Sequence, residues 1–331
     1  MTGPRGRTVA TRGPCDARSP RPFRALSFGR RCPFVYSPLR RLVQLVIAFA
    51  LPLAACARDA PPVVRRASDD FGDTLVLRAA PRRIVSLNPS TTELLFAIGA
   101  GARLVGRTTW DRWPEAALAV PDLGPGLRPN VEAVLGARPD LVLLYASDDN
   151  RDAARRLRAA GVATAAYRVD RIAEFRRVTL ALGALTGDSV AARVTVDSVA
   201  ATIARVRAAT ASLPRPSVFW PLYDQPLLAT GGGSFLNELI DVAGGSNVYG
   251  FLPEPSPRIT VEDLLKRDPE VILLSPDSRA RYLADPRWRA LRAVRENRLL
   301  AVDTTLVFRP GPRLGEAARS VAQLLHPGAV K

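Results

Sequence analysis

The segment that decides the fold is residues 131–144, VEAVLGARPDLVLL, because the chain repeats it as VEDLLKRDPEVILL over residues 261–274. Each copy predicts a short helix that begins after a capping residue, Asn130 or Thr260. A proline and an acidic residue follow the helix, and the apolar run after them is typical of a buried strand. The same helix–strand unit therefore occurs twice, which argues for two similar lobes.

A second pair of matching segments precedes the first pair. Residues 93–99 run from Glu-Leu-Leu to a glycine, and residues 238–244 run from Glu-Leu-Ile to a glycine. Two elements that recur in the same order favour an internal duplication. Chance similarity between generic helix–strand units is the alternative.

Strands and helices alternate within each half. The sequence Ser90-Thr91-Thr92-Glu93 has the form of a capping box and predicts a helix that opens there. The alternation predicts an α/β fold with mostly parallel sheets. Predicted strands cover residues 83–87, 103–106, 141–145 and 162–167 in the first half, and 217–222, 247–249, 271–274 and 299–302 in the second.

One long helix is predicted between the two halves. Residues 188–211 contain neither Gly nor Pro, and a helix of that length would reach about 36 Å. Such a helix joining two α/β lobes would make a rather rigid clamp with a small opening motion. The expected organisation is a first lobe over 74–171, linking helices over 172–212 and a second lobe over 213–331.

The N-terminal region has the composition of a targeting segment. An apolar run over residues 42–55 follows Arg40 and Arg41 and ends at Cys56, as in a secretory signal, and it is too short for a comfortable membrane span. Leu53-Ala54-Ala55-Cys56 resembles the bacterial lipobox, in which the cysteine is lipidated; an ordinary signal followed by an incidental cysteine is the alternative. We expect residues 1–56 to be this signal region, with translation starting downstream of residue 1, at Val35 or Leu39, and residues 57–73 to be a flexible tether.

Charge and rare residues exclude several classes of function. The formal net charge is +16, but residues 1–56 hold ten Arg and one acidic residue, which leaves 37 basic and 30 acidic residues and a charge of +7 for the rest. No basic stripe with interleaved aromatics occurs there, so a nucleic-acid partner is not expected. The three Cys (Cys15, Cys32 and Cys56) precede the body, and His326 is the single His. A multi-His metal site, a thiolate cluster and a triad around a core His are thereby excluded.

Three segments resemble a known family. Residues 83–94, RIVSLNPSTTEL, and residues 130–142, NVEAVLGARPDLV, resemble the periplasmic cobalamin-binding proteins of ABC importers. Residues 233–245, GSFLNELIDVAGG, are similar to the wider superfamily of iron-siderophore and cobalamin receptors. The resemblance covers roughly residues 74–327. It implies two α/β lobes bridged by a backbone helix, with the ligand in the cleft between them.

The resemblance also implies roles for particular residues. Glu132 and Glu262 match the glutamates that pair with arginines of the permease dimer; complementing a helix dipole is the alternative role. Trp110 and Tyr145 match aromatics of the ligand cleft, and Arg309 matches an arginine that reaches the polar rim of the ligand. Tyr223 and Ser90 are further ligand candidates. Packing inside a lobe is the alternative for the aromatics, and a surface ion pair is the alternative for Arg309.

The implied function is a lipid-anchored substrate-binding protein that captures a corrinoid and delivers it to an ABC permease with its ATPase subunits. We expect a monomer at the periplasmic or outer side of the cell envelope, without catalytic residues, metal or cofactor. Gly126 and Ser256 stand where the family pattern has tryptophans, so a ferric siderophore or haem is an alternative ligand. An extracytoplasmic hydrolase built on Ser234 or Ser90 and a sensor lipoprotein without an importer are the alternatives from other classes.

Overall fold

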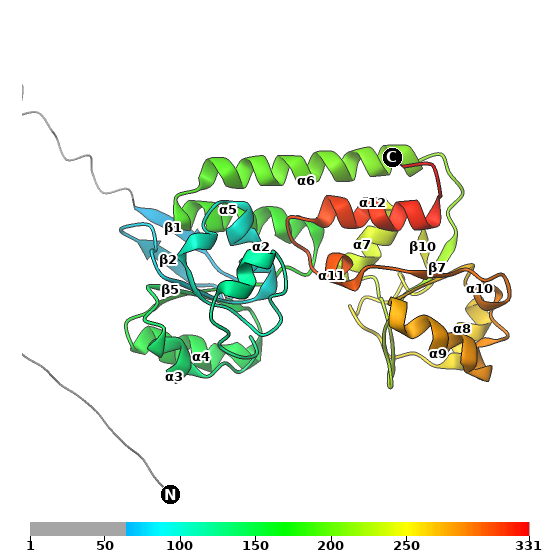
Figure 1. The fold of residues 1–331 in the computed structure, drawn as a ribbon, viewed down its shortest axis with the longest axis horizontal. Coiled ribbons are helices and arrows are strands. Elements are labelled where there is room, and N and C mark those ends of the chain that lie inside the picture. The colour runs from blue at the N-terminus through cyan, green and yellow to red at the C-terminus, as the bar shows by residue number, and fades with distance from the viewer. Residues whose placement is uncertain (1–63, 331) are drawn as a thin grey trace, which may run out of the picture. The chain divides into compact units, whose positions relative to one another are not determined.

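The computed structural model describes residues 64–330, which form two parallel sheets with helices packed around them (Figure 1). Residues 1–56, with the predicted signal and Cys56, and residues 57–63 of the predicted tether lie outside the described part. None of the helices in the described part combines the length and the apolar character needed to cross a bilayer.

The first lobe is a four-stranded sheet in the order β4-β3-β5-β6, and all neighbouring strands are parallel. Its central strands are buried on both faces, as expected of a parallel sheet covered by helices. Its strands are β3 (Ile84–Leu87), β4 (Leu104–Gly106), β5 (Leu141–Tyr145) and β6 (Ala163–Tyr167). Its helices are α2 (Pro89–Ala97), α3 (Val131–Gly136) and α4 (Asp148–Ala159), with short 3₁₀ turns at Gly101–Arg103 and Glu115–Ala119.

The second lobe repeats this arrangement in the order β10-β7-β11-β12, again with parallel neighbours. In both sheets the second strand of the lobe lies beside the first, and the third and fourth follow on the other side. The strands are β7 (Ser217–Phe219), β10 (Ser246–Asn247), β11 (Val271–Leu274) and β12 (Leu299–Ala301). The helices are α7 (Phe235–Val242), α8 (Val261–Arg267), α9 (Arg279–Ala284), α10 (Arg292–Arg295), α11 (Thr304–Val307) and α12 (Leu314–Leu325), with 3₁₀ turns at Pro276–Ser278 and Pro286–Trp288.

Backbone angles at matching positions support the internal duplication. Gly99 and Gly244, which close the first helix of each lobe, have φ of +86° and +78°. Arg138 and Asp268 follow the matching helices α3 and α8, and both also have positive φ, 48° and 38°. Both pairs occupy the places that the two repeated segments assign to them, so the predicted two-lobed α/β fold is confirmed.

The two lobes are joined by α5 (Ile172–Thr186) and α6 (Ser189–Thr210). Gly187, with φ of +89°, lies in the turn between them. The 22 residues of α6 correspond to about 33 Å, and the helix runs past both lobes along one side (Figure 1). The long linking helix predicted over residues 188–211 is therefore confirmed.

The capping box predicted at Ser90–Glu93 is wrong. Helix α2 begins two residues earlier than that box implies, at Pro89, and the side chain of Asn88 caps it by accepting a hydrogen bond from the Ser90 N–H at 3.1 Å. Proline suits the first helical position because its missing N–H would have had no helical partner there. Glu93 is left free of a capping role, and its carboxylate lies in the interior.

Two hairpins were not predicted. The strand expected over residues 217–222 stops at Phe219, and β8 (Pro221–Asp224) instead pairs antiparallel with β9 (Leu227–Ala229). Pro221 lacks the N–H that a continuing ladder would need. In the expected tether, β1 (Arg65–Ser68) pairs with β2 (Thr74–Leu77).

The tether prediction is therefore wrong for residues 65–73. The carboxylate of Asp69 accepts hydrogen bonds from the backbone N–H groups of Phe71 and Asp73 at 3.1 and 2.9 Å, which closes the turn of the hairpin. The same carboxylate accepts the N–H of Ala166 in β6 at 3.0 Å. A polar hairpin turn that one buried aspartate anchors to the sheet has the same composition as a flexible tether. The sequence alone could therefore not distinguish the hairpin from a tether.

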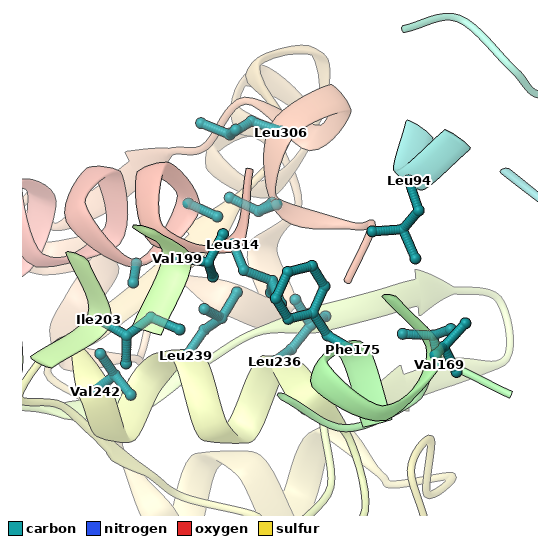
Figure 2. Close-up of a cluster of buried hydrophobic side chains, with 14 of the residues drawn as sticks. Leu94, Val169, Phe175, Val199, Ile203, Leu236, Leu239, Val242, Leu306 and Leu314 are labelled. Atoms are coloured by element: carbon teal, nitrogen blue, oxygen red, sulfur yellow. The ribbon is translucent and has the colours of Figure 1, made fainter. Parts of the chain in front are cut away.

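The largest hydrophobic core of the described residues joins the two lobes. It contains Leu94 of α2 and Phe175 of α5 as well as Leu236 and Leu239 of α7. Figure 2 shows Phe175 pointing toward Leu236 and Leu314. Two further cores are each confined to one lobe. All three cores are built from residues between 71 and 330, so we expect the chain from residue 57 onward to fold by itself.

Candidate functional site

An apolar hollow of about 270 Å³ lies at the carboxyl ends of the strands of the first lobe. Leu87 ends β3 and Tyr145 ends β5. Parallel α/β sheets bind ligands at these strand ends, where the loops can vary without disturbing the sheet. The lining residues are Leu87, Asn88, Pro89, Trp110, Pro125, Gly126, Leu127 and Tyr145.

Trp110 is presented by a rigid turn. The buried carboxylate of Asp111 accepts hydrogen bonds from the N–H and the hydroxyl of Thr108, both at 2.6 Å. Burial raises the pKa of Asp111, against the opposing effect of these hydrogen bonds. Trp110 is 56% exposed, although these hydrogen bonds hold the backbone of the turn that carries it. A large exposed ring on a rigid support is a preformed stacking surface.

Tyr145 forms another wall of this hollow and is held through its hydroxyl. The phenol donates to both carboxylate oxygens of Asp170, at 3.0 and 2.9 Å. Burial, and next the charge of Asp170, raise the pKa of Tyr145, so it remains a protonated phenol. Burial also raises the pKa of Asp170. The hydroxyl of Tyr145 is thus already hydrogen-bonded, and its ring is the part that remains to contact a ligand.

A second and more polar hollow, of about 530 Å³, lies at the matching place in the second lobe, where β11 ends at Leu274. Arg281 forms an ion pair with Asp224, and the hydroxyl of Tyr282 donates to the same carboxylate at 2.6 Å. The Tyr282 ring contacts Trp288 with their centroids 4.6 Å apart. Lining residues include Leu222, Tyr223, Asp224, Ser275, Arg281, Tyr282, Asp285, Arg287, Trp288 and Phe308.

Residues 308 and 309 connect the two hollows. Phe308 lines the hollow of the second lobe. The neighbouring Arg309 donates to the backbone carbonyl of Trp110 in the first lobe and lies 3.3 Å from the buried carboxylate of Glu93. Arg313 approaches the same carboxylate at 3.6 Å, and its guanidinium lies 4.2 Å from the centre of the Trp113 ring. Two consecutive residues, Phe308 and Arg309, thus connect the two hollows, which together make up the candidate site.

Four of the five predicted ligand residues lie at this site. Trp110 and Tyr145 line the hollow of the first lobe, Tyr223 lines the hollow of the second, and Arg309 lies at their junction. Ser90 does not line either hollow: it is largely buried in the first turn of α2. Its backbone N–H donates to the Asn88 side chain at 3.1 Å, which places Ser90 inside the start of the helix and not at the surface of the hollow. The predicted lipidation site, Cys56, lies outside the described residues.

The predicted docking residues occupy identical places on two helices. Glu132 is the second residue of α3 and Glu262 the second residue of α8, and both are exposed. Asn130 accepts from the backbone N–H of Glu132 at 3.0 Å, and Thr260 caps α8 by accepting from the N–H of Asp263 at 3.1 Å. Hydrogen bonds from its own backbone N–H and from Thr260 lower the pKa of Glu262. Glu132 and Glu262 are thus exposed acidic side chains at the starts of matching helices, one in each lobe.

Several residues of the site were missed because their roles depend on contacts between distant segments. Asp170 anchors Tyr145, and Glu93 pairs with the arginines of residues 309–313. The sequence indicated Glu93 only as part of a capping box and of the repeated segment. Gly126 lines the first hollow, and a Cβ added there would collide with the carbonyl oxygen of Leu87. This backbone approach excludes the tryptophan that the family pattern has at that place.

The hydrolase alternative finds no support at the candidate nucleophile. The Ser234 hydroxyl accepts the N–H of Leu236 at 3.2 Å as the cap of α7. The ring of His326 lies 3.3 Å from the carbonyl oxygen of Gly244. Among the described residues, no group of three or more His, Cys, Asp or Glu side chains is placed to hold a metal ion.

The buried charge of Glu93 makes a testable contribution to stability. Burial raises its pKa above the ordinary 4.5, although Arg313 and Arg309 oppose this shift. A raised pKa means that the native state holds the proton more tightly than the unfolded chain does, so the contribution of Glu93 increases as pH falls through that pKa and is complete below 4.5. We expect urea titrations to show that the free energy of unfolding of the Glu93→Gln variant falls further below that of the wild type as pH decreases from about 7 to about 4. A difference that stays constant with pH would contradict this.

Comparison with known proteins relates this chain to substrate-binding proteins. Residues 84–305 match the sequence profile of the periplasmic binding protein family. An ABC transporter substrate-binding lipoprotein of Bacillus subtilis is 28% identical over 275 residues, which cover 80% of this chain and 86% of that protein. A vitamin B12-binding protein of Photorhabdus laumondii is 25% identical over 261 residues, covering 76% and 90%. A crystal structure of a periplasmic heme-binding protein from Pseudomonas aeruginosa superposes with a TM-score of 0.68 and 26% identity, covering 76% of this chain and 94% of the other.

Proposed function

We propose that this chain, which belongs to the periplasmic binding protein family, is the substrate-binding protein of an ABC importer and captures a corrinoid between its two lobes. The observation that carries the proposal is the pair of hollows at the carboxyl ends of the strands of both lobes, which Phe308 and Arg309 connect. One hollow is apolar with two aromatic walls, and the other is lined by ion pairs and rings. The second hollow, of about 530 Å³, is within the volume range of small-molecule sites, and the first, of about 270 Å³, is slightly smaller.

The chemistry of a corrinoid fits this division. Its macrocycle is broad, flat and largely apolar, which suits the exposed ring of Trp110 and the ring of Tyr145. Its edge carries amides, which can donate to carboxylates and accept from guanidinium groups. Asp224 and Arg281 supply both kinds of group in the second hollow. Arg309 donates to the backbone carbonyl of Trp110. It is the arginine that the family resemblance assigns to the polar rim of the ligand.

Haem is the second candidate, and one residue favours it. Haem iron takes an axial ligand from the protein, and tyrosine is one of the side chains that serve. Tyr223 is 60% exposed at the second hollow. The relatives include proteins named for either ligand. A ferric siderophore is the third ligand class of the wider superfamily.

Delivery would follow from the exposed acids of the two lobes. Glu132 and Glu262 each offer one carboxylate to one subunit of a two-fold permease, since equivalent lobes suit equivalent partners. We propose a monomer at the outer side of the cell envelope, held by a lipid at Cys56 and served by a permease dimer with its ATPase subunits. No catalytic role is proposed for any residue.

Titration calorimetry of cyanocobalamin into the chain from residue 57 onward tests the ligand. We expect saturable one-to-one binding at or below about micromolar dissociation constants with quenching of Trp fluorescence. Trp110→Ala should weaken binding about tenfold or more, because the variant loses the exposed stacking surface. Leu118→Ala is the matched control, because Leu118 is also exposed and apolar and lies on the 3₁₀ turn shortly after Trp110, outside both hollows.

The same calorimetric titration is then repeated with the other candidate ligands. Binding of haemin instead of cyanocobalamin, lost in Tyr223→Phe, would establish the second candidate. Binding of a ferric hydroxamate alone would establish the third. An absence of binding to all three would contradict the proposed ligand classes.

A further inference from the structure

Two glutamates at matching places in the two lobes each reach a partner in the opposite lobe. Glu93 of α2 lies 3.3 Å from Arg309 and 3.6 Å from Arg313. Glu238 of α7 forms an ion pair with Arg171 and accepts the backbone N–H of Ile172 at 2.7 Å. We call these two groups the first latch (Glu93, Arg309 and Arg313) and the second latch (Glu238, Arg171 and Ile172).

The latches are related by the internal duplication. Each glutamate lies six residues before the left-handed glycine that closes the first helix of its lobe, Gly99 or Gly244. Each partner segment lies between the fourth strand of the opposite lobe and the helix that covers the interface. Ile172 begins α5 after β6, and Arg313 directly precedes α12 after β12. The two contacts therefore form an approximately two-fold pair across the lobe boundary.

The contacts of both latches are stable unless another charged or polar group competes for the same partners. The side chain of Glu93 is 1% exposed, with Arg309 and Arg313 also mostly buried. A charge in that position is costly unless its partners are present. The carboxylate of Glu238 lies at the N-terminus of α5, where it satisfies an N–H that has no partner within the helix and favours the helix dipole.

The first latch contacts one aromatic residue of the apolar hollow directly, and the second is connected to the other through a neighbouring residue. In the first latch, Arg309 donates to the carbonyl of Trp110. In the second latch, Arg171 is the neighbour of Asp170, which holds the hydroxyl of Tyr145 at 2.9 Å. The carboxylate of Glu174 accepts the backbone N–H groups of both Asp170 and Arg171, at 2.6 and 3.0 Å, so the turn between them is stiff.

We propose that Glu93 and Glu238 are positioning residues, whose latches set the separation of the lobes and hold Trp110 and Tyr145 at the ligand site. A ligand that moves either ring must then shift a latch, and with it the relative positions of the lobes and of their docking glutamates. Coupling of this kind is reciprocal, so lobe separation also controls ligand affinity. The part that concerns ligand and docking rests on the proposed function; the part that concerns lobe separation does not.

Distance measurement between spin labels on the two lobes tests the proposal. The chain from residue 57 onward contains no Cys, so a single labelled pair can be introduced by Arg155→Cys in α4 and Arg295→Cys in α10. Both side chains are exposed. Distances are recorded by pulsed electron resonance without ligand and with saturating cyanocobalamin or haemin, whichever the wild type binds.

Three variants are compared on this background. Glu93→Gln and Glu238→Gln remove the charge of one latch each while keeping the side-chain shape. Asp241→Asn is the matched control, because Asp241 lies on α7 with Glu238 but pairs with Arg215 of its own lobe at 2.7 Å and, more distantly, with Arg207 of the linking helix α6 at 3.9 Å. Circular dichroism confirms that each variant is folded; if Glu93→Gln is not, Glu238→Gln, whose partner Arg171 is half exposed, provides the test.

We expect both latch variants to show a shifted or broadened interlobe distance without ligand and the control to match the wild type. Binding should weaken about five- to tenfold in the latch variants and less than about twofold in the control. Unchanged ligand-free distances in both latch variants would overturn the proposal. If the wild type binds none of the probes, the proposed function fails, and the ligand-free distances still decide whether the latches set the lobe separation.

Discussion

Import falls to background when Glu132 and Glu262 are both replaced by Ala, whereas the purified double variant binds cyanocobalamin as the wild type does. We expect this result because both carboxylates are exposed at helix starts and lie outside the hollows that bind the ligand. A single exposed ion pair contributes about 0–1 kcal/mol. Two pairs placed on equivalent lobes fix the orientation of the encounter, so losing both should cost far more than losing either.

The measurement is uptake of labelled cobalamin in cells that carry each variant as their single copy. Single variants should retain part of the transport. Asp148→Ala with Asp277→Ala is the matched control, since each is an exposed acid in the first turn of a helix, one in each lobe. Normal uptake in the Glu132 and Glu262 double variant would refute the docking role, and a loss of ligand binding would show that these residues act at the site instead.

The sheets could be predicted from the sequence because their strands carry local signals. Residues 141–145 and 271–274 are short apolar runs bounded by Pro and acidic residues, and the structure has strands at those bounds. The order of the strands within each sheet was not predicted, because the local signals show which segments are strands and not which strands pair. In contrast, β8 and β9 depend on how Pro221 ends the ladder of β7, which a run of apolar residues does not reveal.

The candidate site was less predictable because its residues act through partners far along the chain. Trp110, Tyr145 and Arg309 were assigned by resemblance, and the local sequence around them carried no independent signal. Glu93 had the right spacing for a capping box, and its actual partners lie 216 residues away or more. Local spacing can indicate a cap, but it cannot show that Asn88 has already satisfied the helix start.

The other large effect concerns the core that joins the lobes. Phe175→Ala should lower the free energy of unfolding by about 3–5 kcal/mol, because the variant removes a buried ring and leaves a cavity that its neighbours fill only partly. Phe175 is 2% exposed and belongs to the cluster shared by both lobes. Its ring lies among Leu236 and Leu314 of the second lobe (Figure 2). The interlobe distance measured with the same label pair should therefore broaden as well.

Phe219→Ala separates the two consequences of losing a buried ring. Phe219 is fully buried, but its cluster belongs to the second lobe alone. Its replacement should cost a similar free energy of unfolding in urea and leave the interlobe distance as it is in the wild type. Equal broadening in both variants would mean that stability in general fixes the lobes. Broadening in Phe175→Ala alone would mean that the shared core and the two latches act together to hold the lobes, the core through packing and the latches through charge.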